Sequence, residues 1–330
     1  MSAVQTVTGP VDADELGRTL THEHLQARDE AVAAQWPHLA SIAEEEPLHE
    51  VDRDGAYEIA SRLARRTKEL GIDTICDPSA MFLGRDVEFM RRVSEGTGLR
   101  VVPCTGIYTY DYLPPFFAAR DSDAIAEMFV HDIEQGIQGT DIRAAFIKCA
   151  ADEPGITENI EKLHRAAARA SVRTGAPIMA HSRPASGTGL QQIEIFESEG
   201  VDPARVQIAH TGDTDDLDYI ERVLAKGVFI GMDRYGLELY LPYENRQETV
   251  LALLERGYAD RMMLSADHCA TLDWFPIAVA EQMLAAGMAK GWSMTLVPEK
   301  VLPELRERGM SPEQEETMMV SNPRLWLSGS

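Results

Sequence analysis

The sequence predicts an α/β protein, a closed (β/α)8 TIM barrel in which residues 1–330 form a single domain. Short β-rich segments alternate with longer helical segments along the chain, and this order is typical of a parallel sheet. Eight such β-rich segments occur within the 330 residues, and eight is the number that closes a barrel. A doubly wound open sheet is the alternative, but it would place a glycine-rich phosphate loop after the first strand, where this sequence has none.

The predicted elements follow one another in order. Strands are predicted at residues 17–20, 73–76, 99–104, 144–149, 176–180, 205–209, 228–232 and 262–265. Helices are predicted at 52–70, 86–93, 122–137, 157–174, 189–199, 215–226 and 248–257. Thr157 is the expected N-cap of its helix, and Gly175 is the expected stop. We expect an ordered loop at 31–51 and further helices at 297–330, packed on the outside.

Composition excludes several classes of partner. The chain is 44% hydrophobic, enough for a large core, and its formal net charge is −23. Such a charge argues against nucleic acid and anionic membranes, because both require a basic surface. The sequence contains no apolar run of about 18 residues, so it predicts no membrane span. Residues 1–10 do not resemble a signal peptide. Four widely spaced cysteines, of which Cys76, Cys104 and Cys149 lie in apolar segments, indicate free thiols and a cytoplasmic location.

A His-x-His segment follows the first predicted strand. Alternate side chains of a strand share a face, so His22 and His24 point the same way and Glu23 points the opposite way. Two imidazoles that converge on one point suit a divalent transition metal. A pair of surface histidines on a loop is the alternative.

Polar residues also end four later strands. Lys148, His181, His210 and Asp267 stand at or just after the ends of the fourth, fifth, sixth and eighth predicted strands. In a barrel all of these ends open onto one face, and that face carries the chemistry. A single histidine or aspartate there is often an ordinary polar residue or a helix cap. Their recurrence on the same face favours a metal site.

Lys148 has two interpretations. Burial at the end of a strand disfavours the charged ammonium and lowers its pKa, and an uncharged amine beside metal ions can react with carbon dioxide. The resulting carbamate is an anionic oxygen ligand that can bridge two metals. The alternative is an ordinary ion pair, with Asp152 or Glu153 as the partner.

Taken together, these residues resemble the phosphotriesterase family of the amidohydrolase superfamily, and most closely its phosphotriesterase-like lactonases. The resemblance extends from residues 8–10 to residues 321–323 and includes specific motifs. They are 21–24, 105–108, 147–148 with 152–155, 210–215, 231–236, and 267–269 with 273–274. One departure is visible, because lactonases of this type usually have Ser-His-Asp where this chain has Ser265-Ala266-Asp267. It leaves open how Asp267 is hydrogen-bonded.

The resemblance implies a centre of two divalent metal ions, zinc first, with iron, cobalt or manganese as alternatives. It implies that His22, His24 and Asp267 bind the more buried ion and that His181 and His210 bind the more exposed one. Lys148, carboxylated to N6-carboxylysine, would bridge both. Family members are commonly homodimers, so we expect a homodimer here.

The resemblance also implies catalytic roles. Asp267 is the expected proton acceptor, and Tyr108 the expected donor to the developing oxyanion. Arg234 stands where phosphotriesterases proper have histidine and lactonases have arginine. Leu272, Trp274 and Phe275 are the expected apolar groove for an acyl chain. Tyr108 and Arg234 are expected to contact the substrate as well.

These residues predict a lactonase that hydrolyses N-acyl-homoserine lactones or related lactones, with weak activity on organophosphate triesters. A dedicated phosphotriesterase is the first alternative. A non-catalytic metal-binding protein is the second. In the first two cases the partner is a small ester.

Overall fold

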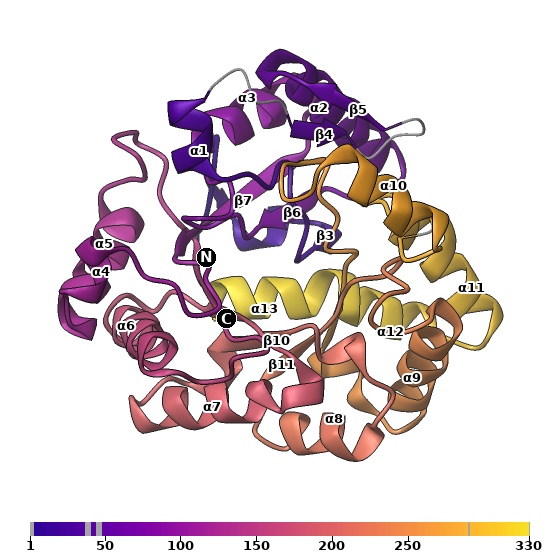
Figure 1. The fold of residues 1–330 in the computed structure, drawn as a ribbon. Helices are drawn as coiled ribbons and strands as arrows, with labels where there is room; N and C mark the ends of the chain where they lie inside the picture. The colour runs from indigo at the N-terminus through magenta and orange to yellow at the C-terminus, as the bar shows by residue number, and fades with distance from the viewer. Residues whose placement is uncertain (1–2, 37–40, 44–47, 290, 330) are drawn as a thin grey trace.

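A computed structural model describes residues 3–36, 41–43, 48–289 and 291–329. Its main sheet has eight strands, all parallel to their neighbours, arranged as a nearly closed barrel surrounded by helices (Figure 1). The predicted barrel is therefore confirmed. In sheet order the strands are β3 (Thr19–Leu20), β6 (Thr74–Asp77), β7 (Arg100–Gly106), β8 (Phe146–Ala150), β9 (Ile178–His181), β10 (Val206–Ala209), β11 (Phe229–Met232) and β12 (Met262–Leu264).

The barrel is completed where β3 and β12 end. Within the described ranges these two strands share no regular ladder, but the residues just beyond them are joined by backbone hydrogen bonds. Asp267 N donates to His22 O at 3.0 Å, and His24 N donates to His268 O at 2.8 Å. We call this junction, formed by residues 22–24 and 265–268, the barrel seam.

Helices cover the outside of the strands (Figure 1). At the start of α6 (Glu158–Thr174), the Thr157 side chain accepts a hydrogen bond from Ile160 N, and Gly175 ends the helix with a φ of 76°. Both predicted ends of this helix are therefore confirmed. The left-handed conformation there suits glycine, which has no Cβ. The helices are α1 (Glu30–Gln35), α2 (Arg53–Glu69), α3 (Val87–Thr97), α4 (Pro115–Ala118), α5 (Ser122–Glu134), α6 (Glu158–Thr174), α7 (Thr188–Ser198), α8 (Leu217–Leu224), α9 (Tyr243–Glu255), α10 (Ile277–Ala285), α11 (Leu302–Glu307), α12 (Pro312–Glu316) and α13 (Asn322–Ser328).

The last helix corrects the prediction that the tail packs outside the barrel. Helix α13 crosses the middle of the barrel in Figure 1, and Trp326 is fully buried in one cluster with inward-facing strand residues such as Phe146 and Phe229. The Phe146 and Trp326 rings lie 5.4 Å apart. A barrel whose strands carry apolar side chains inward needs an apolar cover at its closed end, and α13 provides it.

Trp326→Ala should therefore lower the free energy of unfolding by about 3–5 kcal/mol, the usual cost of removing a large buried aromatic side chain. Urea unfolding followed by circular dichroism measures the change. Leu325→Ala is the matched control, because Leu325 lies on the same helix and is 38% exposed. Equal losses of unfolding free energy in the two variants would show that Trp326 of α13 does not close the core.

Two further segments differ from expectation. Within 31–51, predicted as a loop, β4 (Ser41–Ala43) and β5 (His49–Val51) pair with each other, and β4 also pairs with β13 (Thr271–Leu272). Residues 37–40 and 44–47 of that prediction lie outside the described residues. At the start of the chain, β1 (Ala3–Thr6) and β2 (Gly9–Asp12) form an antiparallel hairpin that was not predicted. These strands are too short to show a periodic pattern.

The cysteine prediction is confirmed: the four cysteines are free thiols, and Cys76, Cys104 and Cys149 are buried. Among the described residues, no helix combines the length and apolar character needed to cross a bilayer.

Candidate metal centre

The six predicted metal ligands lie together where the strands end at the open face of the barrel. Three of them meet at one carboxylate oxygen, because Asp267 Oδ1 lies 3.1 Å from both His22 Nε2 and His24 Nε2. These atoms are close enough to share an ion, and all three residues are supplied by the barrel seam. This is the group expected to hold the more buried metal.

The second pair of histidines faces the same centre. His181 Nδ1 and His210 Nε2 are 3.0 Å apart, and the His22 and His210 rings lie 4.9 Å from centroid to centroid. Both residues are buried at the ends of neighbouring strands, β9 and β10. Burial lowers the pKa of His22 and His181 to about 4, so both rings are uncharged at neutral pH, which is the form that binds metal.

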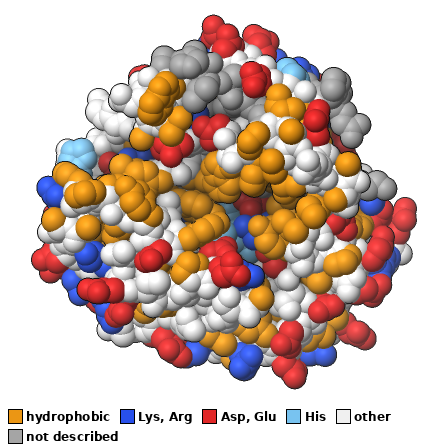
Figure 2. Space-filling model, viewed as in Figure 1, with side chains coloured by type: hydrophobic (Ala, Val, Ile, Leu, Met, Phe, Trp, Pro, Cys, Tyr) orange, Lys and Arg blue, Asp and Glu red, His pale blue; other side chains and the backbone are white. Residues whose placement is uncertain are grey.

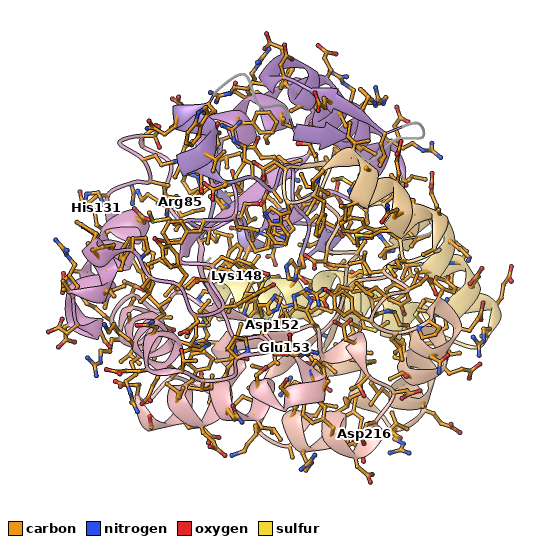
Figure 3. The ribbon with its side chains drawn as sticks, in the orientation of Figure 1. Arg85, His131, Lys148, Asp152, Glu153 and Asp216 are labelled. Carbon is orange, nitrogen blue, oxygen red and sulfur yellow. The ribbon has the colours of Figure 1, made fainter. Side chains whose placement is uncertain are left out.

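Lys148 reaches the same cluster through His22. Its Nζ is 3.2 Å from His22 Nε2 and 3.4 Å from Met179 Sδ, inside the barrel (Figure 3). Burial lowers the pKa of Lys148 to about 8, although the negative charges of Asp267 and Asp233 oppose the shift. At neutral pH the uncharged amine that carbamate formation needs is therefore a minor form, but a far larger fraction than in an exposed lysine.

The alternative ion pair for Lys148 is not what the structure contains. Asp152 instead accepts a hydrogen bond from His181 Nε2 at 2.7 Å, and Glu153 pairs with Arg183 at 3.1 Å. Both carboxylates follow β8 toward the mouth (Figure 3). A buried lysine with histidine neighbours fits a bridging ligand better than a salt-bridge partner.

Asp233 is a site residue that the prediction did not include. Its carboxylate accepts hydrogen bonds from His22 Nδ1 and His210 Nδ1, both at 2.9 Å, and from His210 N at 2.8 Å. Because it holds the Nδ1 atoms, the Nε2 atoms of both rings are left to face the centre, as is usual for metal-binding histidines. Its position directly after the predicted strand 228–232 is the signal that could have found it.

The other two histidines are supported in the same way. His24 Nδ1 lies 2.8 Å from Ser79 Oγ, and His181 Nε2 is held by Asp152. Every histidine of the cluster thus has one ring nitrogen bonded to an outer oxygen and the other facing inward. The donor set of four imidazoles, one carboxylate and one lysine fits two divalent ions.

The backbone is strained at the residues that build the site. His210, Arg234 and Asp267 have φ values of 64°, 66° and 53°, in the left-handed region that residues other than glycine rarely adopt. Such residues persist where the surrounding contacts hold them, and they concentrate at functional sites. All three follow neighbouring strands, β10, β11 and β12.

Arg234 and Asp267 form a largely buried ion pair, which answers how Asp267 is hydrogen-bonded. Arg234 Nε donates to Asp267 Oδ2 at 2.9 Å, and Nη1 of the same guanidinium donates to Asp213 at 2.8 Å. Burial by itself would raise the pKa of Asp267, but His22, His210 and Arg234 hold it well below its usual range. Asp267 is therefore an ionised carboxylate.

Tyr108, the predicted oxyanion donor, lies against His181 of the second pair of histidines. Its hydroxyl lies 3.2 Å from His181 Nδ1 and 2.7 Å from the hydroxyl of Tyr110, a neighbour that the prediction did not include. Burial raises the pKa of Tyr108 well above its usual value, so the hydroxyl keeps its proton and can donate it in a hydrogen bond.

A cavity of about 170 Å³ opens above the ligands, and hydrophobic side chains surround its mouth (Figure 2). Its walls include the three predicted groove residues, Leu272, Trp274 and Phe275. Trp274 is 46% exposed at the rim, and its ring lies 6.2 Å from that of Tyr108. The wall continues along α10 through Met283 and Leu284.

Comparison with known proteins gives one consistent family. The model of the Phosphotriesterase family matches residues 2–327. An aryldialkylphosphatase of Saccharolobus solfataricus is 44% identical over 318 residues, covering 96% of this chain and 97% of that protein. An N-acetyltaurine hydrolase of Xenopus tropicalis is 25% identical over 354 residues, covering 98% and 97%. A solved structure, the phosphotriesterase from Mycobacterium tuberculosis, has a TM-score of 0.89 and 38% identity over 98% of each chain.

Proposed function

Because this chain belongs to the phosphotriesterase family and is a metal-dependent hydrolase, we propose that it hydrolyses N-acyl-homoserine lactones or related lactones. The observation that carries the proposal is the apolar wall that leads away from the metal ligands. It runs from Leu272 through Trp274 and Phe275 to α10, on one side of the cluster. Such a wall suits a neutral ring at the metals with an apolar chain beside it.

The charges of the cavity support a neutral substrate. Among the described residues that line it, the charged side chains are Arg234 and Asp267, and they pair with each other. Arg234 is also paired with Asp213, so its charge is already neutralised. N-acetyltaurine, the compound in the name of one relative, carries a sulfonate that would need an unpaired cation. The cavity favours esters over that anionic amide.

Each residue of the site has its own role in the proposed ester hydrolysis. His22, His24 and Asp267 would hold one metal ion, His181 and His210 a second, and carboxylated Lys148 would link the two. When bound, such ions polarise the substrate carbonyl and lower the pKa of water. The Tyr108 hydroxyl donates a hydrogen bond to the oxygen on which charge develops. The ionised Asp267 accepts the proton of the attacking water. Arg234 holds Asp267 in place and contacts the lactone ring of the substrate.

The specificity prediction follows from the apolar wall. Each buried methylene is worth about 0.8 kcal/mol, so kcat/KM should rise with acyl-chain length until the groove is full. Trp274→Ala should flatten this trend and raise the relative rate on bulky triesters, because it opens the rim. A series of lactones of increasing chain length, assayed with wild type and variant, measures both effects.

Trp36→Ala is the matched control for that series, since Trp36 is 53% exposed and does not line the cavity. It should leave the chain-length trend unchanged. A wild-type enzyme that is indifferent to chain length would contradict the lactonase proposal.

A dedicated phosphotriesterase is the second candidate, favoured by the name of the aryldialkylphosphatase relative. A paraoxon-like triester that is turned over faster than every lactone would establish it. Activity that resists a chelator would instead show that hydrolysis does not need the metals. The zinc preference, the homodimer, the single domain over residues 1–330 and the cytoplasmic location stay predictions.

A further inference from the structure

Glu23 is the one residue of the His-Glu-His segment to which the proposed reaction gives no role. Its side chain is fully buried, and its carboxylate accepts two backbone hydrogen bonds. Oε1 accepts from Ala266 N at 2.7 Å, and Oε2 accepts from His268 N at 3.0 Å. The two donors are the residues on either side of Asp267.

This carboxylate is costly to bury. In the described part of the chain no lysine or arginine forms an ion pair with Glu23, so the burial of its two oxygens is compensated by backbone hydrogen bonds alone. A buried carboxylate without a cation is unfavourable unless its oxygens are bonded. The contacts that compensate it all go to the backbone around Asp267.

The same backbone needs to be held. Asp267 has a φ of 53°, a conformation that relaxes unless its surroundings maintain it. The three successive N–H groups of residues 266–268 are all engaged, the outer two by Glu23 and the middle one by His22 O at 3.0 Å. The seam thus interlocks the segment of His22 and His24 with the segment of Asp267.

We propose that Glu23 is a positioning residue of the metal centre: it holds the backbone on both sides of Asp267 and so sets that carboxylate against His22 and His24. This inference rests on the metal-binding part of the proposed function and is independent of which ester is hydrolysed. The expected consequence of losing Glu23 is a looser Asp267, with weaker metal binding and slower turnover.

An amide cannot replace the carboxylate here. In Glu23→Gln one terminal atom remains an acceptor, but the other becomes an NH2 group that faces a backbone N–H. Either orientation of the amide therefore loses one of the two hydrogen bonds that flank Asp267. Glu23→Asp keeps both oxygens on a shorter stem and should lose less than the glutamine variant.

The matched control is Glu315→Gln. Glu315, in α12, is another buried glutamate, but its carboxylate accepts from Arg18 and Arg306 rather than from the seam. Its replacement should lower the thermal midpoint and leave metal binding unchanged. This control separates loss of stability from loss of positioning.

The test measures metal binding without substrate. Apo protein of the wild type and of the three variants is titrated with Co²⁺ against a competing chelator, and the visible spectrum of the bound cobalt is recorded. Glu23→Gln should bind Co²⁺ about 10-fold or more weakly with an altered spectrum, as for other groups that orient metal ligands. Its kcat should fall by a similar factor, while KM stays within about 2-fold.

Unchanged affinity, spectrum and kcat in Glu23→Gln would overturn the inference. So would equal losses of cobalt affinity in Glu315→Gln, or failure of both Glu23 variants to fold while Glu315→Gln folds, because each outcome assigns Glu23 a purely structural role. Wild-type protein that binds no cobalt would overturn the metal centre and this inference with it. If the wild type binds Co²⁺ and Glu23→Gln binds it equally tightly, only this inference is overturned and the metal centre stands.

Discussion

Lys148→Ala should bind fewer than two metal ions per chain and lose most of its hydrolytic activity, by about 10²-fold or more. The lysine Nζ lies 3.2 Å from His22 Nε2, and under the proposed carboxylation it would supply the oxygens that link the two groups of ligands. Without it the two groups of ligands are no longer linked. Metal content by mass spectrometry and turnover of a lactone measure the loss.

Added short carboxylates test whether Lys148 acts through a carbamate. In Lys148→Ala a carboxylate such as propionate can enter the vacated space and restore part of the activity. Lys148→Met is the matched control, because it also lacks the amine but fills the space with an apolar chain. Rescue is expected in the alanine variant alone. Full metal content with normal turnover in Lys148→Ala would refute the bridging role.

Asp267→Asn should lower kcat by roughly 10²-fold or more and change KM much less. The carboxylate is ionised and lies 3.1 Å from His22 Nε2 and His24 Nε2, so it is placed both to bind metal and to accept a proton. An asparagine keeps the shape and removes the charge and the proton acceptor. Steady-state kinetics on metal-loaded protein measure the split between kcat and KM.

Asp213→Asn serves as the control for Arg234, since the Asp213 carboxylate accepts from the same guanidinium at 2.8 Å and otherwise from Arg246 rather than from a histidine side chain. Its effect on kcat should be smaller than that of Asp267→Asn. If the two variants lose kcat equally, the effect of Asp267 comes from the placement of Arg234. If KM rises more than kcat falls in Asp267→Asn, proton acceptance is not its role.

The sequence by itself determined the barrel and the approximate place of every proposed ligand. Alternation of β-rich and helical segments predicts parallel strands, and a parallel barrel puts all strand ends on one face. Four histidines, Lys148 and Asp267 stand near the ends of these strands, and the strand ends are visible in the local pattern of apolar residues. The period of two also separates Glu23 from His22 and His24. These inferences need only neighbours within a few residues.

Only the tertiary structure decided which side chains form hydrogen bonds with the proposed metal ligands. Lys148 had Asp152 as a nearby candidate in the chain, but Asp152 bonds His181 instead. Asp233 joins the rings of His22 and His210, and Glu23 reaches residues 266 and 268 across the seam. Likewise, Trp326 packs against the closed end of a barrel whose strands all precede it in the sequence. Such contacts join residues far apart in the chain, and they exist only after the barrel has closed, so no local pattern of hydrophobicity or spacing records them.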